Sequence, residues 1–273
     1  MTAAFFGAAC TNTIGAPLAA HRGVNVSRAE DRKKAREGGS DMTKFYLILG
    51  VIAVVGIGAV GYSVGSNTFG TAASEPVEVP GLDDQATLVA MAQGVKKGDE
   101  DAPFTIIEFG DYQCPGCGEF GLSVEPQIDL LLVQTGRAQF IYYDFPLTQV
   151  HPHAFLAARA TRCAQDGDKY WEYHTMLFRN QSSWSVQQSA IGAFVGYAED
   201  VGLEGDAFES CLKSDEHADV VSANMRLGYE LAVPSTPTIM VQGFGQLRRL
   251  RNNSYQGIEE AMAAIEAAAA AGN

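Results

Sequence analysis

The residues of this chain best suited to chemistry are two cysteines, Cys114 and Cys117, separated by a proline and a glycine. A C-x-x-C sequence is compatible with a redox-active pair, with half of a zinc site, or with chance. A structural zinc site needs two further ligands, normally a second close pair. The nearest candidates, His151 and His153, do not have a usual spacing for this purpose, so we expect no bound metal.

The position of Cys114 favours the redox interpretation. Cys114 falls just after a predicted strand and at the start of a predicted helix. Unpaired N–H groups and the helix dipole stabilise a thiolate at such a position. The thiolate is the attacking species in disulfide exchange, and Cys117, one helical turn later, is placed to resolve the mixed disulfide.

Two residues outside the C-x-x-C sequence agree with this chemistry. Glu108 lies in an apolar run before Cys114, where a desolvated carboxyl has a raised pKa and can exchange a proton with Cys117. The alternative for Glu108 is an exposed position on an edge strand. A cis bond between Thr236 and Pro237 would let the backbone pair with an incoming peptide near the cysteines, and an ordinary trans turn is the alternative.

A predicted βαβ unit positions the two cysteines. Residues 104–109 and 138–143 are short, apolar and β-branched runs, which predict buried strands. An amphipathic stretch over 120–133 lies between them, and we expect it to kink at Pro126. Two strands joined through such a crossover are parallel.

The rest of the chain is predicted to be a helical block followed by a ββα unit. Five segments within 152–230 have apolar residues at helical spacing, so we expect this block to be all-helical. The segments are 153–165, 169–180, 186–201, 206–213 and 216–231. Strand character returns at 238–242 and 247–250, and an alanine-rich helix over 256–270 follows. The predicted fold class is α/β.

Five motifs carry a resemblance to a known family. They are Phe109–Cys117 (FGDYQCPGC), Tyr143–Leu147 (YDFPL), His151–Ala154 (HPHA), Lys169–His174 (KYWEYH) and Thr236–Thr238 (TPT). Over about residues 95–268, the chain resembles the exported DsbA family of thioredoxin-fold disulfide oxidoreductases. The resemblance implies a thioredoxin fold with a helical insertion before the cis-proline strand, which agrees with the helical block at 152–230.

The resemblance also implies roles for particular residues. Cys114 would be the nucleophile and Cys117 the resolving thiol. Pro237 would be the cis-proline, preceded by Thr236, and Glu108 would be the buried acid. These five residues are the predicted catalytic residues.

One position departs from the family's pattern. Many strongly oxidising members have a histidine just before the second cysteine, where it stabilises the thiolate, and this chain has Gly116. The departure weakens the inference of an extreme redox potential, though not the inference of the activity.

The function implied by the resemblance is that of a protein-disulfide oxidoreductase that donates the Cys114–Cys117 disulfide to exported proteins during oxidative folding. Its reoxidation would need a membrane quinone reductase of the DsbB or vitamin K epoxide reductase type. We expect a monomer without a cofactor. One alternative is a disulfide reductase or isomerase that a membrane partner keeps reduced. Another is a non-catalytic binding module with a thioredoxin fold.

The three other cysteines lie outside the C-x-x-C sequence. Cys10 precedes the predicted membrane segment, and we expect it to be a reduced bystander. Cys163 and Cys211 both fall in the predicted helical block, on faces that are otherwise apolar. Exported proteins tend to pair their cysteines, so we expect a structural disulfide, with two buried free thiols as the alternative.

Composition excludes several classes of protein. The chain has 273 residues, of which 47% are hydrophobic and 19% charged, so it is neither wholly disordered nor a protein with many membrane spans. Its formal net charge of −13 argues against nucleic-acid binding, which requires a basic surface. The acidic surface implies no specific partner.

A single membrane segment is predicted at residues 45–65. This run has no charged residue, and as a helix it would extend about 31 Å, enough to cross a bilayer core. Seven lysines and arginines precede it, whereas the first charges after it are acidic. The positive-inside rule therefore predicts a cytoplasmic N-terminus and an extracytoplasmic remainder, held at the cell membrane by one signal-anchor helix in contact with lipid.

These features define four predicted regions. Residues 1–44 are a cytoplasmic tail that we expect to be disordered, and 45–65 are the transmembrane anchor. Residues 66–100 are an extracytoplasmic linker, and 101–273 are the thioredoxin-like domain with its helical insertion. The alternatives are a cleaved signal at 45–65 and a start of translation at Met42.

Overall fold

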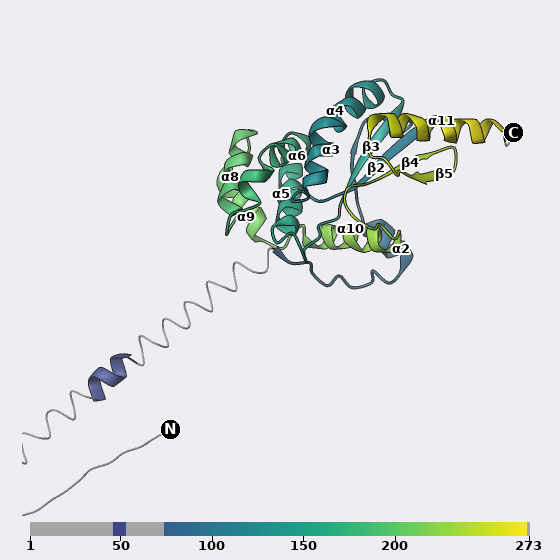
Figure 1. Ribbon diagram of the computed structural model, residues 1–273. Coiled ribbons are helices and arrows are strands. Elements are labelled where there is room, and N and C mark those ends of the chain that lie inside the picture. Colours follow the sequence, from purple (N-terminus) through teal and green to yellow (C-terminus); the bar gives the residue numbers. More distant parts are fainter. Residues whose placement is uncertain (1–45, 53–73, 272–273) are drawn as a thin grey trace, which may run out of the picture. The chain divides into compact units, whose positions relative to one another are not determined.

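The computed structural model describes residues 46–52 and 74–271 (Figure 1). Residues 46–52 are helical and exposed, and they belong to a different unit from the folded domain. The predicted tail at 1–44 and most of the predicted membrane segment at 45–65 lie outside the described residues. In the part of the chain that is described, no helix has both the length and the apolar character needed to cross a bilayer.

The domain is built on a five-stranded sheet in the order β1-β3-β2-β4-β5. The strands are β1 (Val95–Lys97), β2 (Phe104–Gly110), β3 (Ala138–Asp144), β4 (Thr238–Gly243) and β5 (Gln246–Arg249). β2 and β3 are parallel, and every other neighbouring pair is antiparallel. β2 is central, with one face buried along its whole length and the other partly buried at Thr105 and Ile107. The predicted α/β thioredoxin fold is therefore confirmed.

The crossover between the parallel strands starts at the C-x-x-C sequence. α3 (Pro115–Ser123) begins directly after Cys114, with proline at its first position, where a missing N–H costs little. The helix is interrupted at Val124, two residues before the predicted kink at Pro126, and α4 (Glu125–Ile128) begins with Pro126 in its first turn. A π-helical turn over Asp129–Val133 completes the crossover before β3.

The folded domain begins earlier than the predicted boundary at residue 101. α2 (Gln85–Met91) packs against α10 (Ala218–Glu230), and its Leu88 is buried. β1 then pairs with the outer edge of β3, and its Val95 is buried. Part of the predicted linker at 66–100 is therefore structural. β1 is not predicted from the sequence, because Val95-Lys96-Lys97 is short and has little of the apolar character of a strand.

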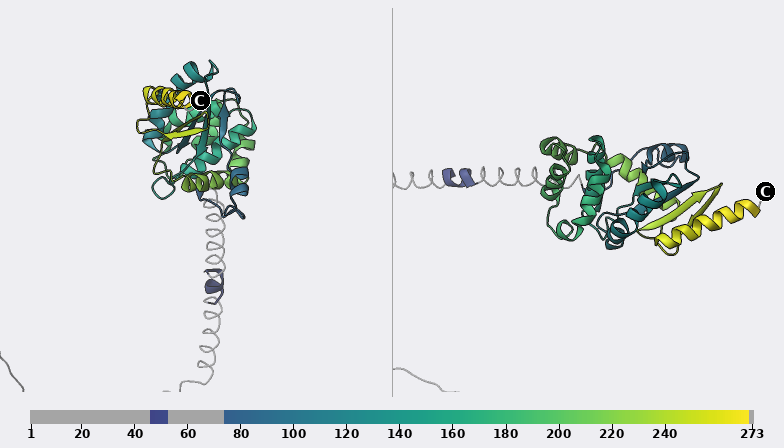
Figure 2. Two further views of the ribbon diagram at one scale, coloured as in Figure 1. Left: turned by 90° about the vertical axis from the view of Figure 1, so that its right-hand side faces the viewer. Right: turned by 90° about the horizontal axis from the view of Figure 1, so that it is seen from above.

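The helical insertion between β3 and β4 is confirmed. It consists of α5 (Ala154–Asp166), α6 (Tyr170–Arg179), α7 (Gln181–Trp184), α8 (Ile191–Asp200), α9 (Gly205–Lys213) and α10. Figures 1 and 2 show α5, α6, α8 and α9 gathered at one end of the domain, away from the final helix α11 (Tyr255–Ala271). The predicted single helix over 186–201 is wrong at its start, because residues 186–190 are not helical.

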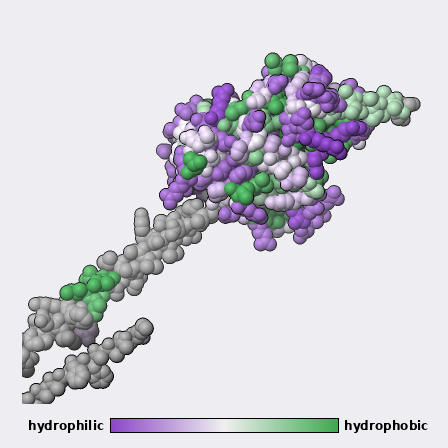
Figure 3. Space-filling model, in the orientation of Figure 1, coloured by the Kyte–Doolittle hydropathy of each residue, from purple (hydrophilic) through white to green (hydrophobic). Residues whose placement is uncertain are grey.

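The two sides of the sheet are covered by helices from different parts of the chain. α11 packs on β4 and α10 packs on β3, and Figure 1 shows these two helices on either side of the sheet. β4 and β5 form a hairpin whose turn contains Gly245 at φ +75°, a conformation that glycine adopts without strain. On the face drawn in Figure 3, the domain's surface is mostly polar, with small separate apolar areas.

Candidate active site

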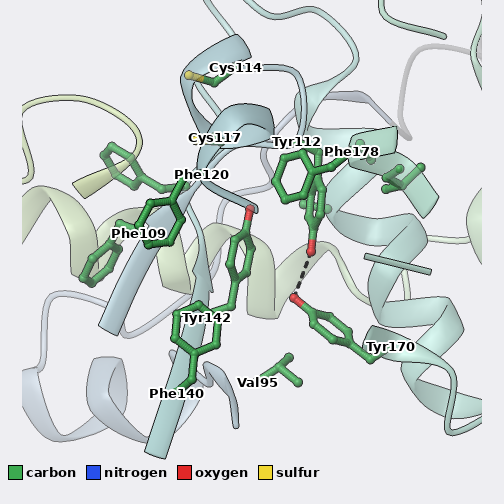
Figure 4. Packing of buried hydrophobic residues seen from close by; sticks show 14 of the residues in the cluster. Val95, Phe109, Tyr112, Cys114, Cys117, Phe120, Phe140, Tyr142, Tyr170 and Phe178 are labelled. Carbon is green, nitrogen blue, oxygen red and sulfur yellow. Dashed lines mark hydrogen bonds between the residues drawn. The ribbon is translucent and has the colours of Figure 1, made fainter. Parts of the chain in front are cut away.

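Cys114 is the N-cap residue of α3, so the strand-to-helix turn after β2 places its thiol at the start of the helix. Cys114 is 9% exposed, whereas Cys117, on the first turn of α3, is fully buried. Both thiols are free. Figure 4 shows the Cys114 sulfur pointing away from the packed aromatic rings below it. Only Cys114 can therefore meet an approaching sulfur atom from another protein.

The surroundings of Cys114 stabilise its thiolate. The hydrogen bond with the Cys117 thiol, followed by Thr236 and the backbone N–H groups of Cys117 and Gly116, lowers the pKa of Cys114 to about 5, although burial opposes this. The protonated thiol of Cys114 donates a hydrogen bond to the carbonyl oxygen of Thr236 at 3.4 Å. A thiol with this pKa is ionised at neutral pH, which is the form that attacks a disulfide.

Cys117 has the opposite character. Burial raises the pKa of the Cys117 thiol well above its ordinary value, and its neighbours Cys114 and Glu108 raise it further. The backbone N–H of Asp111, which lies 3.4 Å from the Cys117 sulfur, acts against these effects and lowers the pKa of Cys117. Cys117 therefore holds a proton when reduced, and the pair contains one thiolate and one thiol.

Glu108 lies on β2 beneath the cysteines, between Tyr142 of β3 and Ile239 of β4. Its side chain is completely buried, and within the described residues neither of its oxygens has a hydrogen-bond partner. Burial raises the pKa of Glu108 well above its ordinary value, and the Glu125 carboxyl adds to this effect. An uncharged carboxyl beside a buried thiol can hold and deliver a proton.

The loop before β4 forms the second side of the site. The Thr236–Pro237 peptide bond is cis. Asn253, from the segment between β5 and α11, donates a hydrogen bond to the Pro237 carbonyl oxygen at 2.8 Å and so helps to hold the loop in place. A Cβ atom added at Gly116 would lie 3.3 Å from Cδ of Pro237, so the turn between the cysteines and this loop are in close contact.

The insertion contributes a residue that the sequence analysis missed. Gln181, the first residue of α7, donates hydrogen bonds to the carbonyl oxygens of Tyr112 and Cys114 at 2.7 and 2.8 Å. Its amide packs where a Cβ atom at Gly118 would lie, 2.8 Å from Oε1. A polar residue after a helix carries no local pattern of function, so only the folded chain reveals that Gln181 holds the cysteine turn.

A second link of this kind comes from the cysteine turn itself. Gln113 donates a hydrogen bond to the carbonyl oxygen of Ser185 at 3.0 Å and accepts one from the backbone N–H of His153 at 2.8 Å. Together with Gln181, this contact fixes the insertion against the site.

Two histidines, His151 and His174, lie close to the cysteine turn. His151 Nδ1 is 2.7 Å from Asp111 Oδ2. His174 is buried on α6, with Nδ1 2.8 Å from the Tyr112 hydroxyl and Nε2 3.0 Å from Glu125. Figure 4 shows the neighbouring bond between the Tyr112 and Tyr170 hydroxyls, which are 3.0 Å apart.

The second cysteine pair lies elsewhere in the domain. Cys163 on α5 and Cys211 on α9 form a disulfide, with their Cα atoms 6.0 Å apart. The bond joins two helices of the insertion that also pack against each other. Cys10 lies outside the described residues.

Comparison with known proteins agrees with this architecture. The family model described as Thioredoxin matches residues 91–265. The crystal structure of oxidised BdbD from Bacillus subtilis superimposes with a TM-score of 0.55 at 26% identity, covering 62% of this chain and 90% of that chain. Wolbachia pipientis alpha-DsbA1, at 20% identity and a TM-score of 0.58, covers 66% of this chain and 94% of its own and shares the fold.

Two kinds of curated relative match the same domain. Disulfide bond formation protein D of Bacillus subtilis is 26% identical over 145 residues, which are 53% of this chain and 65% of that protein. Na(+)/H(+) antiporter NhaA 1 of Salinispora arenicola is 34% identical over 173 residues, which are 63% of this chain. The chain spans about a quarter (24%) of the antiporter's length, so the two proteins share a module rather than a whole architecture.

Proposed function

Since the chain belongs to the thioredoxin family and has a DsbA-like fold, we propose that it is a protein-disulfide oxidoreductase that donates its Cys114–Cys117 disulfide to exported proteins. The observation that carries this proposal is the asymmetry of the two thiols. Cys114 is 9% exposed and has a pKa of about 5, whereas Cys117 is completely buried and has a raised pKa. Such a pair suits thiol–disulfide exchange, in which one sulfur meets the substrate and the other leaves and returns.

The reaction begins from the oxidised pair. A substrate thiolate attacks the Cys114 sulfur, so the Cys114–Cys117 bond breaks and a mixed disulfide forms. Cys117 leaves as a thiolate and, because its pKa is raised, takes a proton from Glu108. A second substrate thiolate then attacks the substrate sulfur of the mixed disulfide and releases Cys114, whose low pKa makes it a good leaving group. Two electrons pass from the substrate to the protein.

The loop at Thr236 and Pro237 would receive the substrate. It lies against the cysteine turn, and the Thr236 carbonyl already accepts a hydrogen bond from the Cys114 thiol. A peptide bound along this loop would bring its own cysteine to Cys114 and not to the buried Cys117. We assign Thr236 and Pro237 to substrate positioning on this basis.

The trapped redox state of the pair in cells tests the direction of the reaction. Alkylation of cells after acid quenching, followed by mass mapping, separates the disulfide from the dithiol at Cys114 and Cys117. A mostly disulfide population is expected for an oxidase that a membrane quinone reductase of the DsbB or vitamin K epoxide reductase type reoxidises. A mostly dithiol population contradicts the proposal and indicates a reductase or isomerase. A pair that never exchanges with a substrate indicates a binding module.

We further propose that residues 45–65 anchor the chain in the cell membrane as a single span, with 1–44 in the cytoplasm and the domain outside. The support is the uncharged segment with basic residues before it and acidic residues after it. The part of 66–100 that precedes α2 would then be the linker. A membrane-impermeant maleimide applied to intact, reduced cells should label Cys114. Labelling that requires cell lysis contradicts this orientation.

The transport activity named for the antiporters is not part of the proposal. The match covers 24% of that protein, and it falls on the cysteine-bearing domain of this chain. A module of this size can be fused to different proteins while its own site keeps one chemistry.

A further inference from the structure

A carboxylate and an imidazole form a pair directly behind the cysteine turn. Asp111 follows β2, and its side chain is completely buried. Its oxygens accept hydrogen bonds from the backbone N–H groups of Gln113 at 2.7 Å and Leu147 at 2.9 Å. His151 Nδ1 lies 2.7 Å from Oδ2. The carboxylate is therefore fixed in place by the backbone, and His151 is its only titratable hydrogen-bond partner within the described residues.

The negative charge of Asp111 is unfavourable for the reaction at this position. Its own backbone N–H lies 3.4 Å from the Cys117 sulfur, and Cys114 is three residues further along the same turn. A buried carboxylate in the turn that carries both cysteines is a negative charge that opposes the formation of a thiolate there. A proton on His151 neutralises that carboxylate and leaves the thiolate next to a net neutral pair.

His151 can gain and lose this proton because it is not sealed off. Its side chain comes from the segment between β3 and α5, and it is 20% exposed. The hydrogen bond with Asp111 raises the pKa of His151, burial opposes this, and the charges of Asp111 and Cys114 raise it further. Linkage is reciprocal, so a thiolate that favours the charged imidazole is favoured by it to the same extent.

We propose that His151, held by Asp111, supplies the positive charge beside Cys114 that a histidine in place of Gly116 would supply, and that loss of this proton weakens the pair as an oxidant. His151 is a positioning and electrostatic residue, since it does not touch the reacting atoms. The titratable groups that face it are Asp111 from the turn after β2 and Cys114 from the start of α3. This inference rests on the proposed redox function of the cysteine pair.

The test compares the full-length chain in detergent with two variants. His151→Asn keeps a nitrogen donor for Asp111 but cannot carry a charge. His153→Asn is the matched control, because the His153 ring lies against the carbonyl oxygen of Gln187 at 2.7 Å and not against Asp111. The Cys114 thiolate is titrated by its absorbance, and the equilibrium with reduced and oxidised glutathione is measured across the range in which histidine titrates.

In His151→Asn, the pKa of Cys114 should rise by about one unit, the effect of losing one nearby opposite charge. Below the pKa of His151, the equilibrium should shift about tenfold toward the disulfide, which corresponds to a potential about 30 mV lower. Above that pKa the wild type is also uncharged, so the two proteins should converge. His153→Asn should follow the wild type at every pH.

Two results would overturn the inference: a His151→Asn variant with the wild-type pH profile, or one displaced by the same amount at every pH, as a purely structural loss would be. If His151→Asn does not fold, Asp111→Asn provides the test. In that variant His151 loses the partner that raises its pKa, so the pH at which the glutathione equilibrium changes should move to a lower value. An unchanged transition contradicts the inference. A wild-type pair that never equilibrates with glutathione contradicts the proposed function itself.

Discussion

The two cysteine pairs of the folded domain lie at opposite ends of their helices. Cys114 caps the N-terminus of α3, whereas Cys163 and Cys211 lie in the last turns of α5 and α9. The N-terminus of a helix carries a partial positive charge and the C-terminus a partial negative charge. A thiolate is therefore stabilised at Cys114 and disfavoured at the other two cysteines.

Burial does not explain the difference, because Cys114 is 9% exposed and Cys163 is 6% exposed. The neighbouring groups do contribute. Hydrogen bonds surround the Cys114 sulfur, whereas a carboxylate oxygen of Asp166 lies 3.9 Å from the Cys211 sulfur. A thiolate of low pKa leaves a disulfide faster. The helix end and its local charges thus distinguish a reactive pair from a structural one.

Removing a sulfur from the reactive pair should have the largest effect. Cys114→Ala should reduce the oxidation of an unfolded, reduced protein to the uncatalysed background, because no attackable sulfur remains at the surface. Cys117→Ala should instead accumulate mixed disulfides through Cys114, since the resolving thiol is gone. Non-reducing electrophoresis with mass mapping distinguishes the two outcomes. An active Cys114→Ala variant contradicts the assigned nucleophile.

Removing the structural pair should affect stability and not reactivity. The disulfide closes a loop of 48 residues in sequence separation, which corresponds to about 4 kcal/mol in the chain-entropy model. The double variant Cys163→Ala/Cys211→Ala should lose up to that amount of unfolding free energy in urea. The wild type with its Cys163–Cys211 bond intact is the reference for the measurement.

The same double variant tests whether the two cysteine pairs are independent of each other. The pKa of Cys114 should stay at about 5, because its causes lie in the cysteine turn and at Thr236. A clear shift in the thiolate titration of the double variant would show that the two pairs are coupled through the insertion.

Glu108→Gln should have the next largest effect, and it tests the proton side of the reactive pair. Without the Glu108 acid, the departing Cys117 thiolate has lost its proton donor, so formation of the mixed disulfide, which releases Cys117, should slow about a hundredfold. Stopped-flow measurement of mixed-disulfide formation checks this. An unchanged rate means that Cys117 takes its proton from another group.

The same variant should change how stability depends on pH. Because burial raises the pKa of Glu108 in the folded state, the folded chain keeps a proton that the unfolded chain releases. The free energy of unfolding therefore falls as pH rises from the unfolded to the folded pKa of this group. Glu108→Gln does not titrate, so urea unfolding over this range should show a smaller decrease. An equal decrease in both proteins contradicts the assignment.

The sequence predicts the reactive cysteine pair better than it predicts the side chains that hold the cysteine turn in place. Cys114, Cys117 and Glu108 are close together in sequence, on a strand and a turn with strong local patterns, so their proximity follows from a βαβ unit. The strands at 104–109 and 138–143 were predicted nearly to the residue for the same reason.

The supporting contacts could not be predicted, because they join distant segments. Gln181 reaches Cys114 across 67 positions, and His151 reaches Asp111 across 40. No periodicity records which polar side chain of a helix or loop will face a turn elsewhere in the fold. The interruption at Val124 and the late start of α8 likewise depend on tertiary packing more than on local propensity.

Asp166→Asn should have the smallest effect, and it tests how much a local charge contributes at the structural pair. Asp166 lies on α5 beside Cys211 and also contacts His217, whose Nε2 is 2.7 Å away. Its side chain is 54% exposed, so solvent screens the charge and removing it should matter little. With this carboxylate gone, a departing thiolate at Cys211 meets less repulsion, and reduction of the Cys163–Cys211 bond by dithiothreitol should accelerate about twofold. Mass mapping of both pairs over time measures this, with the Cys114–Cys117 pair as the internal control. An acceleration that also appears at the Cys114–Cys117 pair would mean that the substitution loosens the domain, and an effect much larger than this would mean that local charge outweighs the helix end.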